Sequence, residues 1–449
     1  MAEMGILVGS RRASYHARTM LSRVAIGEAV HDHYAPRLSA GLGVLGALPD
    51  GARAQQAAGP VGTPTIEPLT IKRRGTGFRG LDPARAFPGF TLFAPTGNTN
   101  KTVYLIDLEG HVVHSWTMPY PPGLYAYLTD RGTLLYNGKI PNDTHLGKSA
   151  YKGGAVLEMD WNGRVLWEVK HADHHHDGLR LRNGNVLLMC GMPLPDEIVL
   201  KVPGGRPGTE YDNGQMNGDY LVEMTTEGKV VWEWRTWDHM DPVDYPITAV
   251  QDGRDDWTHA NGFSEMPDGN ILLSFRNVSS VIMINRKTGA VYWKLGAPPL
   301  SGQHAPVLLE NGHLLLFDNG PHRLDTSLPF SRVLEIDPKT KEIVWRYQEG
   351  IVTSFYSPRV SNAQRLPNGN TLIAEGVFGR LFEVTPDGSV VWEYVNPYFG
   401  PRVADQANKP EVHVNQVFRA YRYSAAEIER ARSTVLRPWC PRAHRSLDL

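Results

Sequence analysis

The sequence predicts an all-β protein, a six-bladed β-propeller of four-stranded blades. The first observation is a repeated element in which a polar turn is followed by a β-branched or aliphatic pair and a tryptophan. The element ends at six tryptophans: Trp116, Trp167, Trp232, Trp293, Trp345 and Trp392. The copies lie 47 to 65 residues apart, and each unit has room for four short strands, as a propeller blade does. We interpret the tryptophans as outer-strand residues that pack one blade on the next.

The second observation is a glycine followed by an aliphatic run, which occurs five times. The glycines are Gly132, Gly184, Gly269, Gly312 and Gly369. Each glycine can end a tight turn, so the segment before it and the run after it form a hairpin. The 45 glycines and 33 prolines of the chain also favour short strands joined by turns over helices.

The third observation concerns how the ring closes. The blade that ends at Trp116 lacks an innermost strand, while residues 412–419 resemble the start of the last repeat at 361–366. We therefore expect a C-terminal strand to complete the N-terminal blade, because this pairing removes exposed sheet edges. A short helix is predicted from Ser424, with Glu427 as the partner in a capping box. The expected divisions are an N-terminal extension at 1–75, the propeller at 76–423, and a C-terminal helix and tail at 424–449.

Residues 10–15 of the N-terminal extension are weakly similar to a twin-arginine export signal. The apolar stretch at 38–48 is short and is cut off from the arginine pair by charged residues. We expect an N-terminal arm more than a cleaved leader, and a cytoplasmic location slightly more than a periplasmic or secreted one. No apolar run approaches the roughly 18–20 residues of a membrane helix, so no membrane partner is expected.

Composition excludes other classes of protein. The net charge of −1 over 449 residues gives no reason to expect a nucleic-acid partner. The two cysteines, Cys190 and Cys440, do not form a disulfide framework. No glycine-rich phosphate loop follows a strand, so no nucleotide cofactor is expected. The sequence is compatible with a homo-oligomer.

Chemically active residues occupy equivalent positions of the repeat. Ten residues before the repeated glycine lie Pro122, His174 and His259; eight before it lie Leu124, His176, Asn261, His304 and Ser361; seven after it lie Lys139, Gly191, Arg276, Asn319 and Gly376. Innermost strands of a propeller line its central channel, so these side chains are expected around one axis. His259 and Asn261 are two residues apart, so on a strand they are expected to point to the same face. An arginine at the end of a buried strand indicates an anion partner.

The motif W-T-H-A-N-G-F at 257–263, the following S-F-R, and G-Q-H-A-P at 302–306 resemble the bacterial arylsulfate sulfotransferase family. The resemblance covers roughly residues 89–423. It implies that His304 is the transiently sulfurylated nucleophile and that His259 and Arg276 bind the sulfuryl group. The run at 174–177 matches the remaining site histidine of the family. Alignment and strand parity favour His176 over His174, with His175 facing away.

The resemblance implies sulfuryl transfer from an aryl sulfate to a phenol by a ping-pong route through a sulfohistidine, without a cofactor. A neutral imidazole is a competent nucleophile, and a guanidinium can hold two sulfuryl oxygens. Residues expected to contact substrate are Asn261, His174, Tyr125, Tyr127, Lys139 and Asn319, with the two tyrosines lining an aromatic acceptor pocket. The acidic segment 238–256 is interpreted as a lid over the channel mouth.

Two alternatives remain open from the sequence. In the first, several imidazoles bind Cu, Zn or Fe in the channel and support a metal-dependent oxidoreductase or lyase; the ligands would be His174, His176, His259, His304 and His413. Against it, Arg276 and Lys139 would repel a cation. In the second, the propeller is a binding module without catalysis. That alternative requires the histidines on outer strands.

Overall fold

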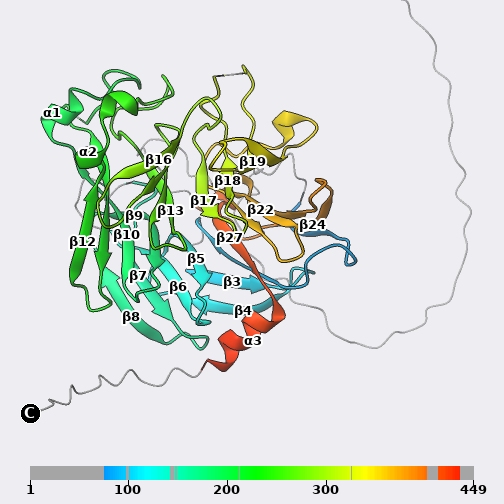
Figure 1. Ribbon diagram of the computed structural model, residues 1–449. Coiled ribbons are helices and arrows are strands. Elements are labelled where there is room, and N and C mark those ends of the chain that lie inside the picture. The colour runs from blue at the N-terminus through cyan, green and yellow to red at the C-terminus, as the bar shows by residue number, and fades with distance from the viewer. Residues whose placement is uncertain are drawn as a thin grey trace, which may run out of the picture. The chain divides into compact units, whose positions relative to one another are not determined.

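The computed structural model describes residues 75–97, 101–141, 146, 149–211, 213–324, 326–401 and 413–434. The predicted N-terminal arm or leader, the arginine pair and Cys440 lie outside these residues. Within them, the chain forms the predicted six-bladed propeller of antiparallel sheets (Figure 1). No helix of the described chain combines the length and apolar character needed to cross a membrane.

Five blades follow one another along the chain, each beginning with its innermost strand. The first comprises β5 (Pro122–Leu128), β6 (Leu134–Lys139), β7 (Gly154–Met159) and β8 (Val165–Lys170). The second comprises β9 (His174–Arg180), β10 (Val186–Pro193), β11 (Asn217–Met224) and β12 (Val230–Arg235). The third comprises β13 (Ala260–Glu265), β14 (Ile271–Phe275), β15 (Ser280–Ile284) and β16 (Val291–Leu295). The fourth comprises β17 (His304–Leu308), β18 (Leu314–Asp318), β19 (Arg332–Ile336) and β20 (Ile343–Tyr347). The fifth comprises β21 (Asn362–Arg365), β22 (Thr371–Glu375), β23 (Arg380–Val384) and β24 (Val390–Val395).

The sixth blade joins the two ends of the chain, as predicted. It is ordered β27 (Val417–Tyr423), β2 (Phe90–Pro95), β3 (Thr102–Ile106) and β4 (Val112–Thr117). Phe90 pairs with Tyr423 and Leu92 with Tyr421, so the red strand β27 lies beside β2, from the first described part of the chain (Figure 1). The two-residue strands β25 (Gly400–Pro401) and β26 (His413–Val414) pair just before β27.

A second closure was not predicted. The strand β1 (Gly77–Leu81) pairs with β24 on the outer edge of the fifth blade, with Phe78 opposite Tyr394. That blade therefore has five strands where four were expected. The added strand covers a row of backbone groups that would otherwise face solvent.

Tryptophans link the blades, which confirms their predicted packing role. The indole Nε1 of Trp116 donates a hydrogen bond to the carbonyl of Asp160 in the next blade, at 3.2 Å. That of Trp392 donates to Leu108 across the closure, at 2.7 Å. The other inter-blade donors are Trp234, Trp293 and Trp345. In the second blade Trp234 makes the link, two residues after the predicted Trp232.

The helical segments are short. They are α1 (Asp196–Val199), α2 (Thr236–His239), α3 (Ala425–Ser433) and the 3₁₀ turns η2 (Pro242–Asp244), η3 (Val352–Ser354) and η4 (Gly376–Phe378). The predicted cap of α3 is confirmed: the Ser424 hydroxyl accepts from the Glu427 N–H, and the Glu427 carboxylate accepts from the Ser424 N–H.

Candidate functional site

A cavity of about 620 Å³ lies where the innermost strands begin, at one mouth of the channel. Five residues predicted for the site line it together: Lys139, His176, His259, Arg276 and His304. They come from four blades and span much of the sequence. The fold therefore brings these residues to one hollow.

His304 is the first residue of β17, and its ring is buried. Its Nδ1 lies 2.8 Å from the Oδ1 of Asn319, which can only accept, so Nδ1 carries the proton. The Asn319 amide is held in turn by its own donors to the carbonyls of Ser357 and Val360. Burial lowers the pKa of His304 well below its ordinary value. His304 is therefore a neutral imidazole whose Nε2 has a lone pair.

One backbone group already uses that lone pair. The Val360 N–H donates to His304 Nε2 at 3.2 Å. Val360 has a φ of 56°, which is unusual for a β-branched residue. The donor lies on the cavity wall, because Val360 is one of the lining residues.

His259 is paired with a carboxylate. Its Nδ1 lies 2.7 Å from Asp256 Oδ2, and its backbone N–H donates to the other carboxylate oxygen at 3.2 Å. The Tyr151 hydroxyl reaches the same carboxylate at 3.5 Å. This geometry directs Nε2 away from Asp256, and Asp256 can balance the charge of a doubly protonated ring.

His176 lies under a tyrosine and beside His259. Its ring stacks on Tyr151 with centroids 4.6 Å apart, and it meets the His259 ring edge-on at 4.9 Å. Its Nδ1 lies 2.8 Å from the Nδ1 of His175. Burial, and then the positive charge of His259, hold the pKa of His176 well below its ordinary value. Nε2 is the ring nitrogen left for the cavity.

Arg276 follows β14 and lines the cavity, and one nitrogen of its guanidinium, Nη1, is hydrogen-bonded to neighbouring side chains. Its Nη1 donates to Asp252 Oδ2 at 3.2 Å and to Asn277 Oδ1 at 2.8 Å. Asp252 is held from the other side by His322 Nε2 at 2.7 Å. Both contacts use Nη1, so the guanidinium is fixed in direction beside the three imidazoles.

The acidic segment 238–256 contributes carboxylates to this site. Asp252 holds Arg276, Asp256 holds His259, and Asp255 lines the cavity. Earlier in the segment, Met240 and Tyr245 are buried in the core of the second and third blades. In the structure the segment is a packed wall of the cavity. Its interpretation as a moving lid stays a prediction.

Other predicted residues lie outside the cavity. His174 is buried, and both its ring nitrogens are hydrogen-bonded to backbone: Nδ1 accepts from Gly154 N–H at 2.9 Å and Nε2 donates to the Asp177 carbonyl at 3.1 Å. Burial lowers the pKa of His174 to about 3. The side-chain amide of Asn261 is buried and donates a hydrogen bond to the Gln303 carbonyl. Asn319 positions His304 and does not line the cavity, and His413 is exposed on β26.

Irregular backbone separates Asn261 from the cavity that His259 lines. The pairing of β13 with β14 shifts register between Ala260 and Gly262, and His259 has a φ of 50°. His176 has a φ of 47°, and its strand shifts register against β10 as well. Strict alternation of side chains fails across a bulge. His259 and Asn261 therefore do not share a face, although they are two residues apart.

The two tyrosines predicted for an acceptor pocket line a different cavity, of about 640 Å³. The Tyr125 hydroxyl donates to Asp177, and the Tyr127 hydroxyl accepts from the Arg180 N–H at 3.0 Å. Arg419 lines this second cavity and donates to Asp177 at 2.8 Å. The two tyrosines therefore do not line the histidine cavity, and their contact with an acceptor stays a prediction. The aromatic lining of the histidine cavity comes instead from Tyr151, Tyr211 and Phe418.

Sequence reasoning missed the residues that support the site. Asp252 and Asp256 fall between the aligned repeat positions, as do the lining residues Tyr151 and Arg359. Asp256 could have been found from the sequence, because it is a carboxylate three residues before His259. The others come from loops and neighbouring strands and carry no repeat signal.

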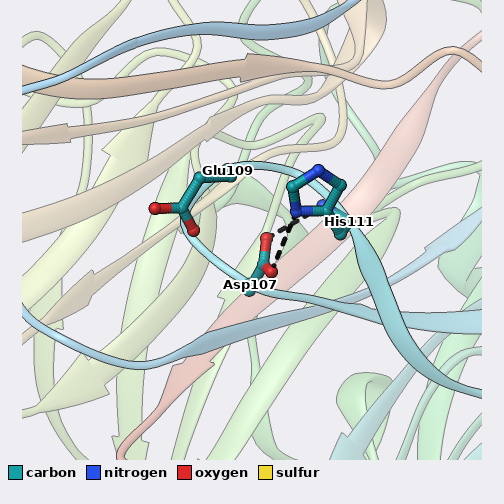
Figure 2. A group of neighbouring side chains, drawn as sticks. All are labelled: Asp107, Glu109 and His111. Atoms are coloured by element: carbon teal, nitrogen blue, oxygen red, sulfur yellow. Dashed lines mark hydrogen bonds and ion pairs between the residues drawn. The ribbon is translucent and has the colours of Figure 1, made fainter. Parts of the chain in front are cut away.

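Within the described residues, one group of three side chains has the spacing of a metal site, and it is not in the channel. Asp107, Glu109 and His111 lie in the turn between β3 and β4 (Figure 2). Asp107 accepts from the His111 backbone N–H at 2.9 Å and approaches His111 Nδ1 at 3.2 Å. These contacts are those of a tight turn. Of the five imidazoles proposed as metal ligands, His176, His259 and His304 line the cavity, whereas His174 and His413 lie outside it.

Comparison with known proteins gives one family. A model of the family described as arylsulfotransferase (ASST) matches residues 83–300 and 299–416. Arylsulfate sulfotransferase AssT of Escherichia coli O6:H1 is 25% identical over 370 residues, covering 63% of this chain and 58% of that protein. The chain thus matches less than two thirds of the length of this relative.

Solved structures that resemble this chain have lower sequence identity to it. A protein of unknown function from Bacteroides caccae has a TM-score of 0.44 and 15% identity, covering 69% of this chain and 94% of its own. A functionally unknown protein from Desulfotomaculum acetoxidans has a TM-score of 0.42 and 8% identity, covering 75% and 99%. Similarity at this level says nothing about chemistry.

Proposed function

Because the chain belongs to the arylsulfotransferase family, we propose that it transfers a sulfuryl group from an aryl sulfate to a phenolic acceptor through a sulfurylated His304. The observation that carries the proposal is the single cavity in which His176, His259, His304 and Arg276 meet. A guanidinium and imidazoles around one hollow suit an anion whose charge spreads in the transition state.

The three imidazoles differ in the partner of Nδ1, and this difference assigns their roles. His304 faces a neutral amide on Asn319, so it stays uncharged and nucleophilic. His259 faces the carboxylate of Asp256, so it can serve as a charged donor to a sulfuryl oxygen. His176 faces another imidazole and is the remaining candidate for proton exchange.

In the first half-reaction Arg276 and His259 hold the sulfuryl oxygens. His304 Nε2 attacks sulfur, the bond between sulfur and the aryl oxygen breaks, and that oxygen leaves with the electron pair. In the second half-reaction a phenol oxygen attacks the same sulfur, and the nitrogen–sulfur bond returns its electrons to Nε2. One nucleophile used twice gives a ping-pong route without a cofactor.

The aryl groups have an aromatic surface near the reacting atoms. Tyr151, Tyr211 and Phe418 line the cavity beside the imidazoles. The Phe418 ring lies 6.1 Å from both the His176 ring and the His304 ring. A flat aryl sulfate can contact these rings while its sulfuryl group faces Arg276. Lys139 adds positive charge to the same wall.

The test is release of p-nitrophenol from p-nitrophenyl sulfate, measured with and without phenol. A transferase gives a burst of product limited to the enzyme present when no acceptor is added, and continuous turnover when phenol is present. Turnover that is independent of phenol indicates a hydrolase, and absence of any release excludes the proposed donor class.

A further inference from the structure

His175 and Asp219 form a buried pair behind His176, outside the residues that line the cavity. His175 Nε2 lies 3.0 Å from Asp219 Oδ1, and the two side chains are 2% and 5% exposed. His175 Nδ1 lies 2.8 Å from His176 Nδ1. A carboxylate, an imidazole and a second imidazole thus form a continuous chain that ends at the cavity.

Asp219 is held as a carboxylate. The Thr258 hydroxyl and the Ala260 N–H, at 2.7 Å, both donate to its other oxygen. Burial alone would raise the pKa of Asp219, but the hydrogen bond and charge of His175 and the Thr258 hydroxyl keep it below its ordinary value. Because a carboxylate only accepts, the Nε2 atom of His175 carries a proton.

The two facing Nδ1 atoms share a single proton. When it is on His176, His175 is neutral and His176 Nε2 is unprotonated and can act as a base. When it is on His175, that ring is an imidazolium beside the Asp219 carboxylate, and His176 Nε2 can hold a different proton. The His176 ring stays neutral in both states.

We propose that Asp219 and His175 form a proton relay through which His176 exchanges a proton with the aryl oxygen, a role that rests on the proposed sulfuryl transfer. As the phenol oxygen bonds to sulfur, its proton passes to His176 Nε2. The Nδ1 proton of His176 passes to His175 Nδ1, and the resulting imidazolium pairs with Asp219. The donor half-reaction runs the same steps in reverse and protonates the leaving oxygen.

The surroundings of His176 explain why a relay is needed. His259, His304 and Arg419 present positive or protonatable groups to it, and burial also disfavours its charged form. Moving the proton to His175 places the new charge next to a carboxylate instead. His175 and Asp219 are accordingly positioning residues, since neither touches substrate.

The test measures the second half-reaction alone. Enzyme loaded with p-nitrophenyl sulfate is mixed with phenols of graded acidity, for wild type, His175→Gln and Asp219→Asn. General acid–base catalysis contributes at least about 10²-fold, so transfer to phenol is expected to fall by about that factor in both variants. Acidic phenols arrive as phenolates and need no base, so their transfer is expected to change only a few-fold.

The matched control is His313→Gln, which breaks another histidine–carboxylate pair, His313 with Glu335 at 2.8 Å, far along the sequence and outside the cavity. It is expected to leave the dependence on acceptor acidity unchanged. Equal losses for all acceptors in His175→Gln and Asp219→Asn, or no loss for phenol, would overturn the relay.

A separate measurement keeps the relay distinct from the proposed function. In ¹⁵N-histidine NMR of the sulfurylated enzyme, the form that takes up the proton of the acceptor, with His176→Gln used to assign the signals, wild-type His176 is expected to be protonated at Nδ1 and bare at Nε2. In His175→Gln this preference is expected to be lost. An unchanged tautomer contradicts the relay, whereas wild-type enzyme that cannot be loaded with a sulfuryl group contradicts the function.

Discussion

The two cavities at opposite ends of the innermost strands are nearly equal in volume, about 620 and 640 Å³, but they differ in their backbone. Four non-glycine residues with positive φ line the first cavity: Leu124, His176, His259 and Val360. Among the described residues that line the second cavity, Ala305 is the only non-glycine residue with a positive φ. Such conformations cost about 1–3 kcal/mol each. The comparison teaches that positive-φ backbone is concentrated at the end of the innermost strands where the histidines line a cavity.

The largest effect is expected for His304→Ala. If the first cavity is the reacting one, turnover of p-nitrophenyl sulfate with phenol should fall on the order of 10⁶-fold, as for removal of an enzyme nucleophile. Stopped-flow absorbance measures the loss, with circular dichroism as the check on folding. A folded variant that keeps its activity would mean that the reacting group lies elsewhere.

Arg276→Ala should lower turnover on the order of 10²–10³-fold, because it removes the main cationic donor to the developing charge. Arg276→Lys keeps the charge but loses the fork, so a partial recovery is expected. Steady-state kinetics with p-nitrophenyl sulfate measures both. Arg182→Ala, at the second cavity, is the matched control, and an equal loss there would break the distinction between the two ends.

Asp256→Asn tests the charged partner of His259 and is expected to have a smaller effect. A hydrogen bond to a charged group contributes about 1.5–3 kcal/mol, which corresponds to roughly a tenfold to hundredfold loss in kcat/KM. The same assay detects it. A variant with wild-type kcat/KM would show that His259 does not need its carboxylate.

Acid should destabilise the fold through the buried histidines. The pKa of His174 is about 3, and burial also depresses those of His176 and His304. Histidines in the unfolded chain have a pKa near 6.5. Below that pH these three residues are protonated in the unfolded chain but not in the native state, which favours unfolding. This stability is present above pH 6.5 and is lost as pH falls towards the depressed values.

Urea unfolding followed by tryptophan fluorescence should therefore show a midpoint that falls between pH 7 and pH 5. His174→Gln removes one of the buried histidines with a lowered pKa, so the urea midpoint of this variant should fall less steeply over that pH range. The same slope in both proteins would contradict the assignment of His174 as a buried neutral ring.

The smallest effect is expected at the second cavity. Tyr127→Phe removes the hydroxyl that accepts from the Arg180 N–H, so stability should fall by about 1 kcal/mol while kcat and KM stay within experimental error. Denaturant unfolding and the transfer assay measure the two quantities. A specific rise in KM would restore the tyrosines as acceptor contacts.

Much of this arrangement was predictable because a repeat fixes topology. The tryptophan and glycine elements predicted the blades, the closure by β27, and the meeting of His304 with Arg276. Alternation failed at His259 and Asn261, since a bulge and a positive φ are tertiary features that period-two patterns do not contain. β1 was missed because it belongs to no repeat unit.

The partners of the imidazoles were harder to predict for another reason. Asn319 lies at an aligned position and was expected to contact substrate, yet its amide bonds to the 357–360 loop turn it towards His304. Asp219 lies on the third strand of its blade and reaches His175 only through the fold. Sequence spacing located the imidazoles and Arg276 that line the cavity, whereas the groups that orient them depend on contacts between blades and loops.

The central claim is that His304 accepts the sulfuryl group in the histidine-lined cavity. The most direct measurement is mass spectrometry of enzyme quenched after incubation with p-nitrophenyl sulfate without acceptor, followed by peptide mapping. The account predicts one added sulfuryl group per chain, located on His304 and discharged by phenol. An adduct on another residue, or active enzyme that never carries one, would contradict it.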